Sequence, residues 1–176
     1  MTRFLDLKEM EEAISEISEM ARGERTRIVL VGGAAMEIYG SDRMAKDVDF
    51  ASRAHLSQLT IVRPLSFGGC SGRSRSGHPV NIIVRCDEYA PLYAEAIDRA
   101  VDSGLLVPVV DPDYLAALKM AAGREKDELD LRTLIRLGMI DHHKTRKIVK
   151  THLGEYAARS LDSLREEVAW LKSREE

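Results

Sequence analysis

A short apolar run that ends at two glycines constrains this chain more than any other part of its sequence. Residues 27–31 (Arg-Ile-Val-Leu-Val) are rich in β-branched side chains and predict a buried strand. Gly32 and Gly33 then give the backbone a freedom that other residues lack, and residues 34–39 favour a helix that Gly40 closes. A strand, a glycine turn and a helix in this order expose backbone N–H groups where a phosphate can bind. The alternative is that the glycines serve only the geometry of the turn.

Two aspartates follow this turn on a second expected strand. Asp47 and Asp49 are two positions apart, so both side chains point to one face, while Val48 and Phe50 point toward a core. Two carboxylates this close repel each other unless a cation lies between them or one of them takes up a proton. Oxygen ligands of this kind suit Mg²⁺ or Mn²⁺. The pair therefore indicates a metal site, and the alternative is a solvated acidic pair beside a turn.

Taken together, these segments resemble a known family. Gly32-Gly33-Ala34-Ala35 followed by residues 43–50 is similar to the signature of the polymerase-β-like nucleotidyltransferase superfamily, in which Asp-x-Asp follows a Gly-Gly or Gly-Ser turn. Residues 112–131 resemble the small bacterial members related to abortive-infection and toxin–antitoxin nucleotidyltransferases, which show a Leu-x-x-Lys-x-x-Ala-Gly-Arg-x-Lys-Asp-x-x-Asp-Leu run. The two blocks together span most of residues 27–137.

The resemblance implies a reaction and a set of site residues. The implied reaction moves a nucleoside monophosphate from an NTP to a hydroxyl of RNA (often tRNA), of a protein or of a small molecule, with Mg²⁺ or Mn²⁺ as cofactor. Asp47 and Asp49 would hold the metal and act in catalysis together with Asn81. The implied nucleotide-binding residues are Gly32, Gly33, Ala34, Arg43, Lys119, Lys126 and Asp127. For Lys119 the alternative is a side chain that only extends to solvent, and for Lys126 and Asp127 it is a charged helix start.

Asn81 departs from the family pattern. The family places a third carboxylate on a later strand, and the matching position of the expected strand 79–84 holds Asn81. An amide can bind a metal through its oxygen, but it is neutral and is not a base. Asp87 lies about 20 Å further along an extended strand and is not expected to reach the site. The alternative function is therefore a catalytically weakened relative that binds a nucleotide or a partner protein.

Charge and cysteine content bound the remaining possibilities. The chain has 176 residues and a net charge of −3, so it is not a broadly basic nucleic-acid binder. A local patch made of Arg73, Arg75 and residues 144–147 remains as an RNA-binding alternative. Cys70 and Cys86 have no metal-binding spacing and are expected to be free thiols in a reducing cytoplasm.

No targeting or membrane segment is expected. Charges at Arg3 and Asp6 interrupt the first residues, which do not show a signal-peptide pattern. No apolar run approaches the ~20 residues that a membrane helix needs. These features predict a cytoplasmic location.

The expected architecture is α+β, with a small mixed sheet flanked by helices as a minimal nucleotidyltransferase core. Residues 1–111 would form this core with an N-terminal helix capped by Asp6, and residues 112–176 a helical region packed on it. The run 59–67 predicts an edge strand because it contains Pro64. The other expected elements are a loop at 68–77, a strand at 80–84 and helices at 5–21, 90–101, 112–122, 125–137, 141–152 and 154–173.

The last expected helix carries an apolar stripe. Its members are Leu153, Tyr156, Ala157, Leu161, Leu164, Val168 and Leu171. Such a stripe usually packs against the same chain, and the alternative is an interface with a partner protein or a second copy.

Overall fold

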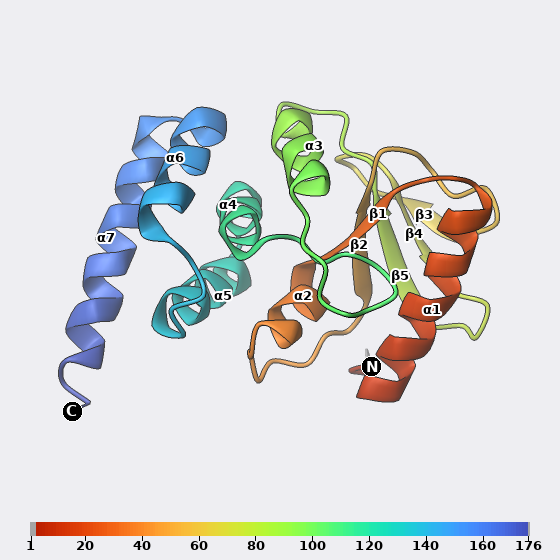
Figure 1. Cartoon of the computed structure of the whole chain (residues 1–176), viewed down its shortest axis with the longest axis horizontal. Coiled ribbons are helices and arrows are strands. Elements are labelled where there is room, and N and C mark those ends of the chain that lie inside the picture. The colour runs from red at the N-terminus through yellow and green to blue at the C-terminus, as the bar shows by residue number, and fades with distance from the viewer. Residues whose placement is uncertain (1–2, 176) are drawn as a thin grey trace. The chain divides into compact units, whose positions relative to one another are not determined.

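Five strands form one mixed sheet in the computed structural model, which describes residues 3–175 (Figure 1). In chain order they are β1 (Ile28–Val31), β2 (Val48–Ser52), β3 (Thr60–Pro64), β4 (Cys70–Arg73) and β5 (Pro79–Ile83). Their order in the sheet is β1-β2-β5-β4-β3. β2 pairs with β5 in parallel, and the other neighbours are antiparallel. The predicted α+β class with a mixed sheet flanked by helices is confirmed.

Three helices accompany the sheet and all contact β2. They are α1 (Leu7–Gly23), α2 (Gly32–Ile38) and α3 (Ala90–Asp98). The predicted cap of α1 is confirmed, since the Asp6 carboxylate accepts from the backbone N–H of Glu9 at 2.8 Å. The Glu9 side chain in turn accepts from the N–H of Asp6 at 2.9 Å, which completes a capping box. This reciprocal pair fixes where the first helix begins.

The centre of the sheet is fully buried. All four residues of β1 are buried, and Phe50 on β2 and Ile82 on β5 are completely enclosed. The segment after α3 covers the outer edge of β1, because the N–H of Leu30 donates to Pro108 O at 2.9 Å and that of Val110 donates to Leu30 O at 3.0 Å. The edge of β1 is therefore satisfied by the chain itself.

The prediction of a flexible loop over residues 68–77 is wrong for residues 70–73, because these form β4, which lies in the interior of the sheet between β5 and β3. Residues 68–69 and 74–77 on either side of β4 are not in a strand. A Cβ on Gly72 would lie 2.7 Å from the carbonyl oxygen of Thr60 and 2.8 Å from the Leu59 side chain. Glycine is needed here so that two strands can approach closely. The glycine content that suggested a loop reflects tight packing instead.

The edge position predicted from Pro64 is confirmed. β3 ends the sheet, all five of its residues are exposed, and its register shifts between Ile61 and Arg63. Pro64 has no N–H to donate, and a bulged edge strand is where a sheet tolerates that loss.

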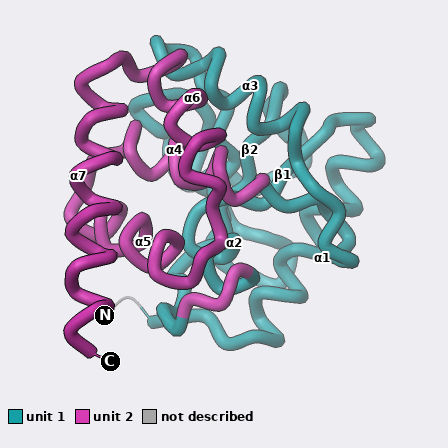
Figure 2. Tube along the Cα trace, turned by 60° about the vertical axis from the view of Figure 1, so that its left-hand side comes forward, with its two compact units in different colours: residues 1–38, 42–110 teal, residues 39–41, 111–176 magenta. Residues whose placement is uncertain are grey.

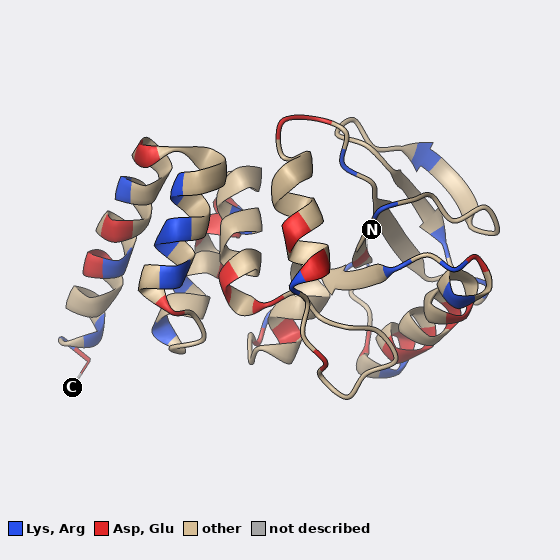
Figure 3. Ribbon diagram, turned by 45° about the horizontal axis from the view of Figure 1, so that its top comes forward, with Lys and Arg blue, Asp and Glu red and all other residues tan. Residues whose placement is uncertain are grey.

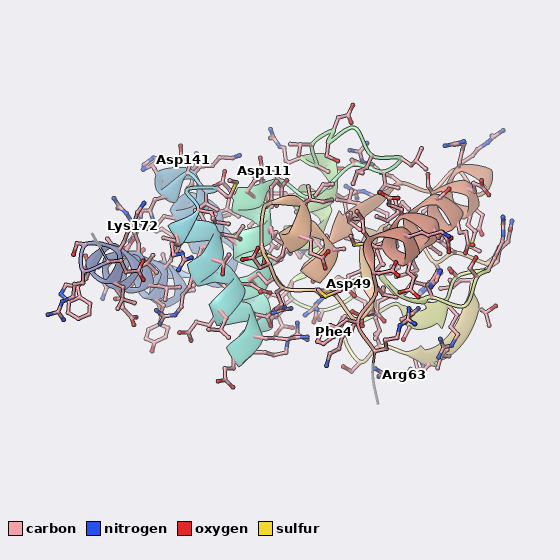
Figure 4. All side chains as sticks on the ribbon, turned by 90° about the horizontal axis from the view of Figure 1, so that it is seen from below. Phe4, Asp49, Arg63, Asp111, Asp141 and Lys172 are labelled. Atoms are coloured by element: carbon pink, nitrogen blue, oxygen red, sulfur yellow. The ribbon has the colours of Figure 1, made fainter. Side chains whose placement is uncertain are left out.

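The C-terminal part of the chain is helical. It contains α4 (Pro112–Ala122), α5 (Glu125–Arg136), α6 (His142–Leu153) and α7 (Glu155–Lys172). α4 contacts α5 and α6, and α7 also contacts α5 and α6, so the four helices enclose a common core. Two aspartates labelled in Figure 4 cap α4 and α6: Asp111 accepts from the N–H of Asp113 at 2.9 Å, and Asp141 accepts from the N–H of Lys144 at 3.0 Å.

The apolar stripe of α7 is only partly buried. Leu161, Leu164 and Val168 lie in the helical core as predicted. The prediction fails at the two ends, where Tyr156 is 87% exposed and Leu171 is 44% exposed. The buried length of the stripe thus matches the part of α7 that faces α5 and α6.

The chain divides into two compact units, which Figure 2 shows in different colours. The first comprises residues 1–38 and 42–110 and holds the sheet, and the second comprises residues 39–41 and 111–176 and holds α4 to α7. Among the described residues, no helix combines the length and the apolar character needed to cross a bilayer.

Replacing Gly72 with alanine is expected to destabilise the protein by about 1–3 kcal/mol, because the added Cβ must displace the Thr60 backbone or Leu59. Urea unfolding measures this change. Gly23 is the matched control: it ends α1, has ordinary φ and has open space around its Cβ position, so Gly23→Ala should be neutral or slightly stabilising. Equal stabilities for the two variants would contradict the role given to Gly72.

Candidate active site

The register of two parallel strands brings the predicted site residues together. Asp49 on β2 pairs directly with Asn81 on β5, and Asp47 stands one residue before β2 begins. Side chains at the same register of neighbouring strands lie on one face of the sheet. Asp47, Asp49 and Asn81 therefore share a face, and all three are half-buried.

A single nitrogen atom links the two carboxylates. Asn81 Nδ2 donates to Asp47 Oδ2 at 3.0 Å and to Asp49 Oδ1 at 2.7 Å. One oxygen of each carboxylate thus converges on the same point, where a positively charged group would be held by both. In the described conformation the amide N–H groups of Asn81 reduce the repulsion that two neighbouring carboxylates would otherwise feel.

The donor set fits a hard divalent cation. Two carboxylate oxygens already converge, and a half-turn about the Cβ–Cγ bond of Asn81 would present its amide oxygen in place of its nitrogen. Within residues 3–175 no group of three or more His, Cys, Asp or Glu side chains is placed to hold a metal. At this site the third residue is the neutral amide Asn81 and not a carboxylate.

The glycine turn lies against the second carboxylate. Gly32 has a φ of +66°, and a Cβ there would lie 2.9 Å from both Cβ and Cγ of Asp49 and closer still to its Oδ2. Glycine is therefore required twice at this position, by the backbone conformation and by the carboxylate. The start of α2, with Gly32, Gly33 and Ala34, is placed directly beside Asp49.

Arg43 is brought next to the same turn. A Cβ on Gly33 would lie 3.3 Å from Cβ of Ala45 and 3.9 Å from a guanidinium nitrogen of Arg43. The N–H of Ala45 donates to Glu37 on α2 at 2.6 Å, which fastens this stretch to the helix. Arg43 thus lies near Gly33, and Gly32 lies against Asp49, all within the first unit.

Asp87 is used elsewhere. Its carboxylate accepts from Arg85 Nε at 2.8 Å and from the backbone N–H of Tyr89 at 3.2 Å. The Arg85 hydrogen bond, followed by the charge of Arg85 and the Tyr89 N–H, outweighs the effect of burial and lowers the pKa of Asp87. Asp87 orders the entry to α3 and is committed to that contact.

A cavity that the sequence did not reveal lies on the Asp47 side of the site. It has a volume of about 560 Å³ and belongs entirely to the first unit. Its lining residues are Arg3, Leu5, Glu9, Lys46, Asp47, Arg73, Gly77, His78 and Pro79. They come from four separate segments of the chain and form no motif, so only the tertiary fold assembles them.

The loop that carries Arg73 and Arg75, expected as part of an RNA-binding patch, is tied to α1, whose acidic residues Figure 3 colours red. Arg75 Nη1 pairs with Glu19 at 3.1 Å, and the backbone N–H of Ser76 donates to Glu16 at 3.0 Å. Arg73 Nη1 donates within the turn, to Gly77 O at 2.8 Å. The turn between β4 and β5 is thus held at several points.

The basic stretch 144–147 is largely neutralised within the second unit. Lys144 Nζ lies 2.9 Å from both Asp111 and Asp113, whose hydrogen bonds and charges raise its pKa against a smaller effect of burial. Arg146 Nε pairs with Asp162 at 2.9 Å. Two of its three basic residues are thus already paired, which weakens the RNA-binding alternative.

Lys119 and Asp127, two further predicted nucleotide-binding residues, form a charged cluster in the second unit. Lys119 is 6% exposed, and its Nζ lies 2.6 Å from Asp130 and 3.3 Å from Asp127. Arg124 Nε also pairs with Asp127 at 2.6 Å. Lys119 therefore does not extend to solvent, and the cluster joins α4 to α5. Lys126 is exposed near the start of α5, and a nucleotide role for these residues stays a prediction.

The cluster lowers the pKa of Asp127. Burial alone would raise this pKa, but the hydrogen bond from Arg124 and the charges of Lys119 and Arg124 together outweigh it. The ionised form of Asp127 is thus stabilised in the folded state.

Known proteins are similar to this chain in structure. It superimposes on an antigenic nucleotidyltransferase-like protein from Paracoccidioides brasiliensis with a TM-score of 0.55 and 16% identity, over 93% of this chain and 95% of that one. A candidate nucleotidyltransferase from H. pylori gives a TM-score of 0.51 and 14% identity, over 98% and 99%. No protein-family model and no curated protein matches the sequence. The fold is therefore that of nucleotidyltransferase-like proteins.

Asp127 should make stability depend on pH. Its folded-state pKa lies below the usual 3.8, so its contribution is present above about pH 4 and is lost as the pH falls through the folded pKa. Asp127→Asn should cost about 3 kcal/mol at pH 7, because Lys119 loses a buried partner, and less at pH 3. Urea unfolding from pH 3 to 7 measures this. Glu128→Gln removes an exposed partner of Arg132 on the same helix and should change stability by less than about 1 kcal/mol; a cost for Asp127→Asn that does not vary with pH would contradict the argument.

Proposed function

We propose that this protein is a metal-dependent nucleotidyltransferase, which moves a nucleoside monophosphate from an NTP to a hydroxyl and releases pyrophosphate. The observation that carries the proposal is the convergence of Asp47, Asp49 and Asn81 beside the Gly32 turn. The similarity of the whole fold to nucleotidyltransferase-like proteins supports it. The close contact of Gly32 with a carboxylate and the pair of neighbouring carboxylates at the start of β2 are both costly to maintain, and a phosphoryl-transfer site gives a reason for each.

Asp47 and Asp49 would hold Mg²⁺ or Mn²⁺, which supplies positive charge that activates the attacking hydroxyl and neutralises the leaving pyrophosphate. Asn81 would complete the set of oxygen ligands after turning its amide. The backbone N–H groups of Gly32, Gly33 and Ala34 would bind the triphosphate, since they begin α2 beside Asp49. The guanidinium of Arg43, next to Gly33, would add a phosphate contact.

Asp47 is the carboxylate best placed to meet an acceptor. It lines the cavity of about 560 Å³, whereas Asp49 faces the glycine turn. A hydroxyl that entered the cavity would approach Asp47 first, and a carboxylate can accept its proton. Asp47 would thus act on the acceptor hydroxyl, and Asp49 would act on the side of the donor triphosphate.

The second candidate is a catalytically weakened relative that binds a nucleotide or a partner protein. Asn81 favours it, because an amide occupies the third position and donates to both carboxylates in place of a base. A role in a toxin–antitoxin or phage-defence system rests on the resemblance of residues 112–131. The exposed Tyr156 and Trp170 of α7 would suit a partner protein or a second copy.

A working nucleotide site predicts metal-dependent stabilisation. The melting temperature should rise by about 5–10 °C when an NTP that binds is present with Mg²⁺ at about 100 times its Kd. Binding at that concentration adds about 2.7 kcal/mol to the free energy of unfolding. Asp49→Asn should abolish the shift. Asp98→Asn is the matched control, since Asp98 is exposed, pairs with Arg53 and lies far along the chain from the site. Absence of a shift with all four NTPs would overturn the enzyme proposal.

Restoring the third carboxylate separates the two candidates. Asn81→Asp should raise pyrophosphate release at least about tenfold if the chain is an enzyme that lacks a base, since a positioned base contributes about 10²–10⁴-fold. Asn81→Ala removes the same amide contacts without adding a carboxylate and should not raise the rate. Pyrophosphate release from each NTP, with total RNA as acceptor, is the measurement. Equal rates for wild type and Asn81→Asp would show that a missing carboxylate does not limit activity.

A further inference from the structure

The lining of the cavity beside Asp47 contains more cationic than anionic side chains. Arg3, Lys46 and Arg73 line it, against the two carboxylates Glu9 and Asp47. The Glu9 carboxylate is already engaged by Arg3 and by the backbone N–H of Asp6. Lys46 and Arg73 are the further cations of the lining, which they share with Asp47, and they are available to an anionic ligand in the cavity.

Two of these cations are positioned and still have donors to offer. Lys46 lies over the Phe4 ring, with Nζ 5.2 Å from the ring centroid. Arg73 Nη1 donates to Gly77 O at 2.8 Å, which orients a guanidinium that has five N–H donors in all. His78, also in the lining, is held by Glu12 at 3.0 Å. A phosphate group is the ligand that such a fork and an ammonium recognise best.

The cavity and the glycine turn adjoin different carboxylates of the site. Gly32 lies against Asp49, whereas the lining includes Asp47 and none of Gly32, Gly33 or Asp49. In phosphoryl transfer the attacking and leaving oxygens are in line, so acceptor and pyrophosphate occupy opposite sides of the transferred group. With the triphosphate on the glycine side, the cavity is left for the acceptor.

We propose that the cavity binds an acceptor that carries a phosphate group near its reacting hydroxyl, with Arg73 and Lys46 as the residues that recognise this phosphate. The inference rests on the proposed nucleotidyltransferase function and adds the chemical class of its acceptor. A volume of about 560 Å³ accommodates a sugar phosphate or one nucleotide of an RNA chain. These two sources share the same recognition chemistry.

Binding of phosphate compounds in EDTA tests the proposal without any reaction. Ribose 5-phosphate and a short oligouridylate are titrated into the full chain and followed by NMR, with ribose as the uncharged comparison. Both phosphate probes, or one of them, should bind while ribose does not. The probe that binds at least about tenfold more tightly, a difference of about 1.4 kcal/mol, identifies the source of the phosphate.

Matched variants assign the binding to the cavity. Arg73→Gln and Lys46→Gln should each weaken binding of the preferred probe at least about fivefold, because each removes one of two cations that face the phosphate. Arg75→Gln is the control: it lies two residues further on the same turn, pairs with Glu19 and does not line the cavity, so its affinity should change less than about twofold.

The outcomes separate this proposal from the proposed function. Asp49→Asn should keep phosphate binding in EDTA while it loses the NTP-dependent shift. Absence of binding by the wild type, or equal losses in Arg73→Gln and Arg75→Gln, would overturn the acceptor site and leave the NTP site standing. Weakened Mg–NTP binding in Arg73→Gln would also overturn it, because the cavity would then serve the donor triphosphate. Phosphate binding without any NTP shift would overturn both.

Discussion

The parallel pairing of β2 with β5 is the interaction on which the candidate site depends. It sets Asp49 opposite Asn81, so that one amide nitrogen reaches both Asp49 and Asp47. A register shift of one residue would turn Asn81 to the other face of the sheet, away from the two aspartates. The apolar neighbours of Asn81 on β5 would then leave the core. The register is fixed by burial, since Val48, Phe50 and Ile82 have no exposed surface. The burial of these apolar side chains thus sets the strand register that positions Asp47, Asp49 and Asn81.

The local part of this arrangement could be predicted from the sequence. A strand, two glycines and a helix are consecutive, and the face shared by Asp47 and Asp49 follows from their spacing alone. The prediction that Asn81 lies on a strand is also confirmed, because the apolar residues around it in the sequence form β5. The sequence pattern does not predict the contact of Asn81 with the two aspartates. That contact requires β2 and β5 to be neighbours in the sheet, although about thirty residues separate them along the chain.

The features that composition did not predict are those formed by residues far apart along the chain. Gly72 is typical of a loop by composition, but the close approach of Thr60 on β3 is what requires a glycine there. The cavity was missed for a related reason: Arg3, Lys46 and Arg73 belong to separate segments and stand near one another only after folding. The spacing of Asp127 and Asp130 on one helix face allowed them to be expected near Lys119, and the packing of α4 against α5 brings all three together.

An amide beside the two aspartates would change the electrostatics of the proposed metal site both with and without a cation. Three carboxylates would repel one another strongly without a cation, whereas Asn81 donates hydrogen bonds to both aspartates and favours the metal-free form. A cation must then displace that contact and gains one fewer negative ligand, so its affinity should be lower than at a three-carboxylate site. In the proposed acceptor site, Lys46 and Arg73 line the cavity together with Asp47 and would be attracted to its charge until a phosphate bound them. Metal and phosphate ligands would therefore favour each other's binding, since each relieves the charge that opposes the other.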